Sequence, residues 1–269
     1  MEGIADGFAD SEGARIHYIA AKPERAKKLS ILFVPGVMMP AWIWEKQIAH
    51  FSNDYHVVAM EPRSQGDSDK VLEGHNAFMM AKDIQAVVRS LNLEQLILVG
   101  WSIGVPQVLN YAAHFAAGKL RGLVLVDGIA GLDPTVSFYP SIVEFWSQFQ
   151  MDRVANTKKF IKMIFKKPYS EEYYERLTEV ALRTSTDTVM TLLYNYILQD
   201  FRSLLPKIRT PTYMAVINGP RIQYMEKMQK NLPNSYMEVF ESGHALFADE
   251  PEHFNRSLEA FITKLEEVN

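Results

Sequence analysis

A serine with glycines spaced evenly around it is the clearest chemical feature of the chain. The pentapeptide Gly-Trp-Ser-Ile-Gly at 100–104 follows the apolar run Leu96–Val99 and precedes a helical pattern from Val105. A strand that turns sharply into a helix holds such a serine at a positive φ, and the two glycines relieve the crowding around it. The first turn of the helix directs backbone N–H groups toward developing negative charge. The spacing therefore predicts that Ser102 is the nucleophile of a hydrolase.

A histidine near the end of the sequence is the candidate base. His244 follows an alternating stretch at 235–240, which indicates a last strand and then a loop that carries the histidine. An imidazole there can take the proton of the serine hydroxyl as a general base. The order of nucleophile and then base excludes the chymotrypsin arrangement. The remaining histidines are interpreted as surface or structural residues: His17, His50, His56, His75, His114 and His253.

Several separated segments resemble the α/β-hydrolase superfamily. They are the oxyanion-loop pattern Val34–Val37, the aromatic segment Trp42–Trp44 with Gln47, the turn Glu61–Ser68 (similar to the family pattern P-x-R-G-x-G-x-S), and the surroundings of Ser102 and His244. The resemblance spans nearly the whole chain outside residues 131–205. It implies an α/β fold with a mostly parallel sheet, helices on both faces and an inserted helical lid. It also implies an oxyanion hole made by the backbone N–H groups of Val37 and Ile103.

The carboxylate that should orient His244 is missing from its usual place in this family. In most relatives an aspartate follows the seventh strand, but here Pro220 stands near that slot, and no aspartate occurs from Thr212 to Ala248. Asp127 ends the preceding strand, and some branches of the family take their acid from that strand. We therefore predict Asp127 as the third member of the triad. Two alternatives stay open: Asp127 only caps a turn, or Asn218 orients the imidazole without balancing its charge.

The spacing of apolar residues predicts the organisation of the chain. Strands are expected at 16–20, 30–34, 56–60, 96–99, 123–126 and 212–217, with helical periodicity between several of them. Strands that alternate with helices favour a parallel sheet covered on both faces. We expect residues 1–130 and 206–269 to form the hydrolase core and residues 131–205 to form a helical cap.

The predicted cap is rich in aromatic side chains. We expect most of them to pack the cap against the core and some to line the cavity, which favours an apolar or aromatic small-molecule substrate. These residues are Phe138, Tyr139, Phe145, Trp146, Phe149, Phe160, Phe165, Tyr169, Tyr173, Tyr174, Tyr194 and Tyr196.

The composition is that of a compact enzyme. The chain has 269 residues, of which 48% are hydrophobic and 22% charged, and its formal net charge of −4 with no basic run argues against nucleic-acid binding. No apolar stretch reaches the roughly 20 residues that span a bilayer, and residues 1–10 lack the features of a signal peptide, so we expect a cytoplasmic protein. The absence of cysteine and of zinc-like histidine spacing leaves a metal or cofactor unsupported. Nothing in the sequence determines an oligomeric state.

The sequence thus predicts acyl transfer to water. Ser102 attacks the carbonyl of a carboxylic ester, thioester or lactone, and His244 removes its proton. The amides of Val37 and Ile103 receive the oxyanion, while Asp127 holds the imidazole. One alternative comes from a resemblance to cofactor-independent quinolone dioxygenases, in which a His/Asp pair deprotonates a heterocycle, although the histidines that flank the serine position there are absent here. The other is a non-catalytic ligand receptor, which a large separation of Asp127 from His244 would favour.

Overall fold

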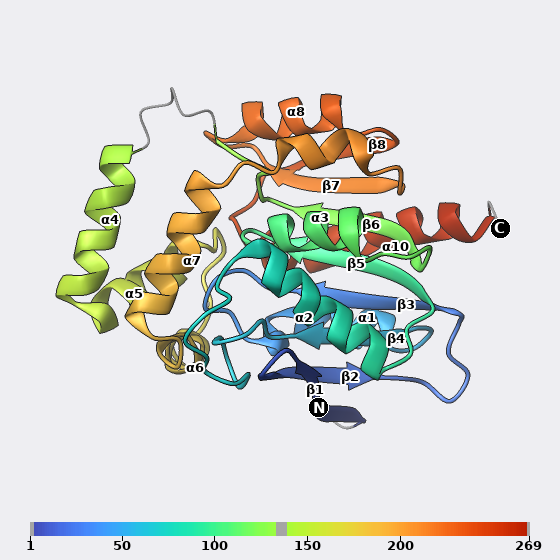
Figure 1. Cartoon of the computed structure of the whole chain (residues 1–269), viewed down its shortest axis with the longest axis horizontal. Helices are drawn as coiled ribbons and strands as arrows, with labels where there is room; N and C mark the ends of the chain where they lie inside the picture. The colour runs from blue at the N-terminus through green and yellow to red at the C-terminus, as the bar shows by residue number, and fades with distance from the viewer. Residues whose placement is uncertain (1–2, 133–138, 268–269) are drawn as a thin grey trace.

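The computed structural model describes residues 3–132 and 139–267. In these residues the chain forms one eight-stranded sheet of order β1-β2-β4-β3-β5-β6-β7-β8 (Figure 1). The first two pairings, β1 with β2 and β2 with β4, are antiparallel, and the others are parallel. The strands are β1 (Ile4–Ser11), β2 (Ala14–Ala21), β3 (Leu29–Val34), β4 (His56–Met60), β5 (Gln95–Trp101), β6 (Leu120–Val126), β7 (Thr212–Ile217) and β8 (Ser235–Phe240). The predicted α/β class with a mostly parallel sheet is confirmed.

The central strands are apolar along their length because helices cover both faces of the sheet. In β5, residues 96–101 are all buried, and in β6 residues 122–126 are buried. The register pairs Trp101 with Val126, so these two strands end level with each other. Residues directly after β5 and β6 are therefore neighbours, although the sequence separates them by about two dozen positions.

Two hydrophobic clusters, one on each face, join the sheet to its helices. One contains side chains of helices α1 (Glu45–Phe51) and α10 (Pro251–Glu267), and the other contains side chains of helices α2 (Ala77–Ser90), α3 (Gly104–His114) and α8 (Ile222–Asn231). Asn76 caps the start of α2, because its side chain accepts a hydrogen bond from the Met79 amide. The elements around the sheet are η1 (Ala41–Trp44), α1 (Glu45–Phe51), α2 (Ala77–Ser90), α3 (Gly104–His114), η2 (Arg202–Lys207), α8 (Ile222–Asn231), α9 (Leu246–Asp249) and α10 (Pro251–Glu267).

Between β6 and β7 the chain leaves the sheet and forms a group of helices. They are α4 (Tyr139–Met151), α5 (Arg153–Met163), α6 (Glu171–Leu182) and α7 (Thr186–Leu198). Figure 1 shows this group beyond one end of the sheet, on the side where β3 and β7 end. The last three helices each start at a side-chain cap, namely Asp152, Ser170 and Ser185. Residues 133–138 of the predicted cap, with Phe138 among them, lie outside the described residues.

Strand β1 was not predicted from the sequence. Its residues include a glycine and two aspartates, which are uncommon in strands, and it pairs on one side only, with β2. Charged residues on an edge strand oppose pairing with other chains. This composition suits the edge of a sheet. It also lacks a continuous apolar run, so the pattern of apolar residues does not predict a strand here.

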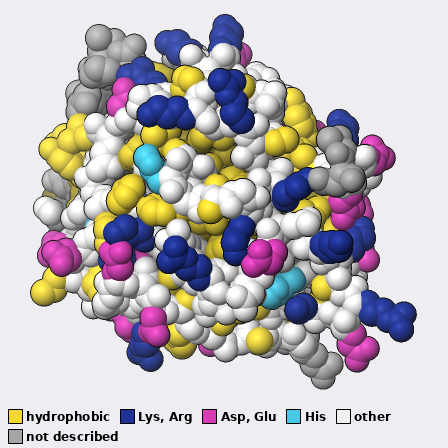
Figure 2. Space-filling view, turned by 45° about the vertical axis from the view of Figure 1, so that its right-hand side comes forward, with side chains coloured by type: hydrophobic (Ala, Val, Ile, Leu, Met, Phe, Trp, Pro, Cys, Tyr) yellow, Lys and Arg dark blue, Asp and Glu magenta, His cyan; other side chains and the backbone are white. Residues whose placement is uncertain are grey.

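The surface is mixed in character. On the face that Figure 2 shows, basic and acidic side chains are scattered over the surface, with hydrophobic side chains between them. Within residues 3–132 and 139–267, no helix has the length and apolar character needed to cross a bilayer.

Candidate active site

Ser102 lies at the turn from β5 into α3. Its φ is 57°, the left-handed conformation that the glycine spacing predicts, and the residue is 8% exposed. A side chain at Gly100 would place its Cβ 2.7 Å from Val108 and 2.8 Å from the carbonyl oxygen of Gly104. Only glycine therefore lets the strand turn this tightly into the helix. The Ser102 amide donates to the carbonyl of Val126 (2.9 Å), which fixes the turn to the end of β6.

The loop after β3 packs directly on this turn. A Cβ at Gly36 would lie 3.2 Å from the Trp101 ring and 3.3 Å from the Ser102 Cβ, so the loop approaches closely because it carries no side chain there. The next amides along the loop are anchored: the Met38 amide donates to Gln65 Oε1 (2.7 Å). In the described part of the chain, however, the amides of Val37 and Ile103 donate no hydrogen bond. Both residues are buried and line the same cavity as Ser102.

The loop that carries His244 is held from two sides. The Trp101 indole N–H donates to the His244 carbonyl (2.9 Å), which links this loop to the Ser102 turn. The Asp249 carboxylate, 2% exposed, accepts from the Gly243 amide (3.0 Å) and from the Lys166 amide (2.7 Å) in the segment after α5. The backbone around the imidazole is therefore fixed both to the sheet and to the helices inserted before β7.

Asp127 lies directly after β6 and contacts the imidazole. Its Oδ2 is 2.5 Å from Nδ1 of His244, and its Oδ1 accepts from the Ile217 amide at 3.3 Å. This contact makes Nδ1 the protonated nitrogen and leaves Nε2 as a proton acceptor. Burial opposes ionisation of Asp127, but the hydrogen bond and charge of His244, together with Arg221 and the Ile217 amide, outweigh it and hold the pKa of the carboxyl below its ordinary value.

Arg221 is a third neighbour of this pair, and the sequence reasoning did not single it out. Its Nη2 lies 3.3 Å from Asp127 Oδ2 and 3.4 Å from His244 Nδ1. Because Nδ1 already donates to Asp127 at the shorter distance, the contact with the imidazole is proximity rather than a hydrogen bond. The segment was recognised in the sequence only as one without an acid. The signal available in the sequence was the positively charged Arg221 directly after Pro220, the residue near the usual position of the acid.

The other candidate for orienting the imidazole, Asn218, has a different partner. Its Nδ2 donates to Glu241 Oε1 at 2.9 Å. The amide therefore connects the ends of β7 and β8, and no hydrogen bond joins it to His244 in the described residues.

Ser102 and His244 line one cavity but are not hydrogen-bonded to each other in the described residues. Hydrogen bonds between a nucleophile and its base are often long without substrate and tighten in the reacting complex. The structure thus brings Ser102, Ile103, Val37 and His244 to the wall of one cavity and places Asp127 behind the imidazole.

This cavity has a volume of about 670 Å³ and a mostly apolar wall. The sheet side supplies the residues just described, and the inserted helices supply Phe145, Trp146, Phe160, Leu193 and Tyr196. Other aromatic residues of the insertion, such as Phe149 and Phe165, are buried in the hydrophobic core instead. The volume is in the range of pockets that enclose small organic molecules.

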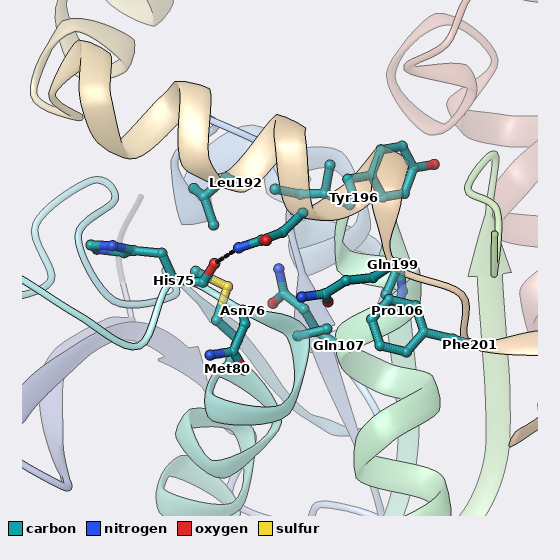
Figure 3. Close-up of a pocket in the computed structure, with 12 residues that line it drawn as sticks. His75, Asn76, Met80, Pro106, Gln107, Leu192, Tyr196, Gln199 and Phe201 are labelled. Atoms are coloured by element: carbon teal, nitrogen blue, oxygen red, sulfur yellow. Dashed lines mark hydrogen bonds between the residues drawn. The ribbon is translucent and has the colours of Figure 1, made fainter. Parts of the chain in front are cut away.

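A much smaller pocket of about 20 Å³ lies beside it, between α2, α3 and α7 (Figure 3). It shares Ile103 and Tyr196 with the large cavity. The Asn195 side chain donates to the His75 carbonyl across it at 2.7 Å, and Oε1 of Gln107 is buried there without a partner in the described residues. A space of this size has room for a water molecule but not for an organic substrate.

One cluster in the described residues has the composition of a metal site. Atoms of His17, Glu61 and Asp67 lie within 4.8 Å of one another. The Glu61 carboxylate, however, accepts from His17 Nδ1 (2.8 Å), the Ala41 amide (2.9 Å) and the Asp67 amide (2.6 Å), while the Asp67 side chain pairs with Arg183. These contacts give the cluster a structural role: they connect β2, the turn at 61–68 and the loop after β3.

Comparison with known proteins gives consistent matches. The sequence profile of a family described as alpha/beta hydrolase fold matches residues 30–251. The chain is 25% identical over 242 residues to the AB hydrolase superfamily protein YisY of Bacillus subtilis, covering 86% of this chain and 90% of that protein.

Solved structures show the same fold. An esterase from Exiguobacterium antarcticum is similar with a TM-score of 0.87 and 22% identity, over 96% of this chain and 100% of that one. A bromoperoxidase from Bacillus anthracis has a TM-score of 0.87 and 21% identity, again over 96% and 100%.

Proposed function

The chain belongs to the α/β-hydrolase fold family, and from this premise we propose that it is a serine hydrolase that cleaves an ester-like bond through an acyl-enzyme. The bond is that of a carboxylic ester, thioester or lactone in a small molecule with an apolar or aromatic body. The observation that carries the proposal is the buried contact of 2.5 Å between Asp127 and His244, beside a cavity that also exposes Ser102.

In this mechanism Ser102 attacks the carbonyl carbon while Nε2 of His244 takes its proton. The hydrogen bond to Asp127 fixes the required tautomer and stabilises the imidazolium that forms. The imidazolium then gives its proton to the leaving oxygen or sulfur. Water, deprotonated by the same imidazole, attacks the acyl-enzyme and regenerates the serine.

The two unpaired amides supply the oxyanion hole. Val37 and Ile103 line the same cavity as Ser102, and neither amide has an acceptor in the described residues. A buried amide without a partner is costly, so a site that keeps two of them is suited to a negative charge that develops in the transition state.

We assign residues 131–205 as the cap that shapes the substrate site. In the part of this range that the structure describes, α4, α5 and α7 contribute aromatic and aliphatic side chains to the cavity. An apolar wall excludes water and favours an apolar substrate body. A large separation of Asp127 from His244 would favour the alternative of a ligand receptor, and that separation is not observed.

Active-site labelling tests the proposal. We expect a fluorophosphonate probe to label the wild type and not Ser102→Ala, and 4-nitrophenyl butanoate to be hydrolysed by the wild type. Asp127→Asn should lose labelling, whereas the matched control Asn218→Ala, which only breaks the contact with Glu241, should keep it. A folded wild type that neither reacts with the probe nor cleaves esters would refute the proposal. Consumption of oxygen with a 3-hydroxy-4-quinolone would then favour the dioxygenase alternative.

A further inference from the structure

One charged side chain in the cavity has no task in the reaction described above. Arg221 lines the cavity next to Pro220, at the start of α8. No aspartate or glutamate is among the described residues that line this cavity. The guanidinium therefore faces a mostly apolar space whose described lining includes no carboxylate, and its ion pair is with Asp127, which is not part of that lining.

The pairing of this guanidinium with Asp127 is weak and incomplete. The distance of 3.3 Å to Oδ2 exceeds the roughly 2.7–2.9 Å typical of a charge-assisted hydrogen bond. The same oxygen is already engaged by His244 at 2.5 Å. In the described residues, Nε and Nη1 of Arg221 have no hydrogen-bond partner, and 34% of the side chain is exposed. Arg221 thus has free donors in the fork arrangement that matches a carboxylate.

We propose that Arg221 binds a carboxylate group of the substrate, so that the substrate combines an apolar body, an ester-like bond and one carboxylate. This inference rests on the proposed hydrolase function and adds the substrate class. The body of such a molecule fits the apolar wall of the cavity of about 670 Å³, and its carboxylate takes the free donors at the Arg221 end.

Binding of this kind also changes the charge around the base. In the free enzyme the guanidinium lies near both Asp127 and the imidazole, where its positive charge opposes formation of the imidazolium. A substrate carboxylate neutralises that positive charge. Asp127 then stabilises the imidazolium with less opposition, so a carboxylate-bearing ester gains in turnover as well as in binding.

Two matched pairs of aromatic esters test the inference. The first pair is the mono-4-nitrophenyl ester of terephthalic acid and its methyl ester, in which the carboxylate lies on the acyl half. The second pair is 4-(butanoyloxy)benzoate and its methyl ester, with the carboxylate on the leaving phenol. The measured quantity is the ratio of kcat/KM for the carboxylate to kcat/KM for the methyl ester. Both esters of a pair are measured on the same enzyme preparation, so a change in the amount of folded, active enzyme cancels in the ratio.

We expect Arg221→Gln to lower this ratio by about 10- to 100-fold for at least one pair, because a hydrogen bond to a charged group contributes on this scale. Arg221→Lys should restore part of it. Lys230→Gln is the matched control: it removes the same charge from the exposed end of α8, away from the cavity, and should leave the ratio unchanged.

The outcomes separate this inference from the hydrolase proposal. If the methyl esters are cleaved but the ratio is the same in the wild type and in Arg221→Gln for both pairs, the role of Arg221 is refuted and the hydrolase proposal stands. If no ester is cleaved, the hydrolase proposal fails. Calorimetric titration of Ser102→Ala with each pair still measures the preference for the carboxylate without turnover, and an equal affinity for both members would refute carboxylate recognition.

Discussion

Replacing Asp127 by asparagine removes a full negative charge beside the imidazolium while the shape is nearly kept. In a partly screened site, opposite charges about 4 Å apart attract by about 4 kcal/mol, which corresponds to about 10³-fold in rate. The loss also leaves Arg221, 3.4 Å from Nδ1, as an unopposed cation, and with its partial exposure this repulsion adds about 1 kcal/mol. We therefore expect kcat/KM to fall by between about 10³- and 10⁴-fold, in line with a carboxylate-to-amide change in a triad.

The assay is hydrolysis of 4-nitrophenyl butanoate, with circular dichroism and thermal unfolding as checks that the variant is folded. The double variant Asp127→Asn with Arg221→Gln lacks the residual repulsion and should recover about fivefold of the lost rate. A folded Asp127→Asn enzyme that keeps more than a tenth of wild-type kcat/KM would refute the assignment of Asp127 as the triad acid.

Three further changes have defined expected outcomes. Burial lowers the pKa of His17, but Glu61 and Asp6 outweigh burial and raise this pKa to about 9, above its ordinary value of 6.5. Protonated His17 therefore stabilises the fold fully below about pH 6.5, and this stabilisation is lost as the pH rises through about 9. We expect Tm to fall over this pH window in the wild type and to fall less in His17→Gln. Gly36→Ala should lower kcat by between about 10- and 100-fold with little change in KM, because the new Cβ displaces the oxyanion loop, and an unchanged kcat would contradict that role. Asp249→Ala should reduce the free energy of unfolding in urea by about 2–4 kcal/mol, because it leaves the part-buried amides of Gly243 and Lys166 without their charged acceptor. A loss within error of zero would show that water replaces the carboxylate.

The sequence was informative where a local rule constrains the backbone. The strand positions and the sharp turn at Ser102 followed from apolar runs and glycine spacing, and the observed φ of 57° agrees with that reasoning. Strand ends differ by up to three residues, as at β6, which begins at Leu120 rather than at residue 123. The ends of a strand depend on its pairing with neighbouring strands, and the spacing of apolar residues gives no information about that pairing.

Contacts between distant segments were less accessible. Asp127 and His244 are 117 residues apart, and only the family resemblance suggested that two adjacent strand ends could present them to each other. Arg221 illustrates the limit: an arginine at a helix start is usually a solvated residue, and its place at the cavity follows from how β7 and α8 pack. Likewise, which aromatic residues of the insertion face the cavity depends on helix rotation, which a dense aromatic pattern does not determine.

The double attachment of Asp249, to the loop of His244 and to the chain after α5, limits how the enzyme can open. An outward swing of the whole insertion as a rigid flap would break the bond to the Lys166 amide and disturb the base at the same moment. Helices α4 and α7 meet through the Trp146 and Tyr194 rings, so we expect that separation of these two helices admits substrate and leaves the bond between Asp249 and the Lys166 amide intact. Substitutions at that seam should change how fast molecules pass, whereas substitutions near residue 166 should change the chemistry itself.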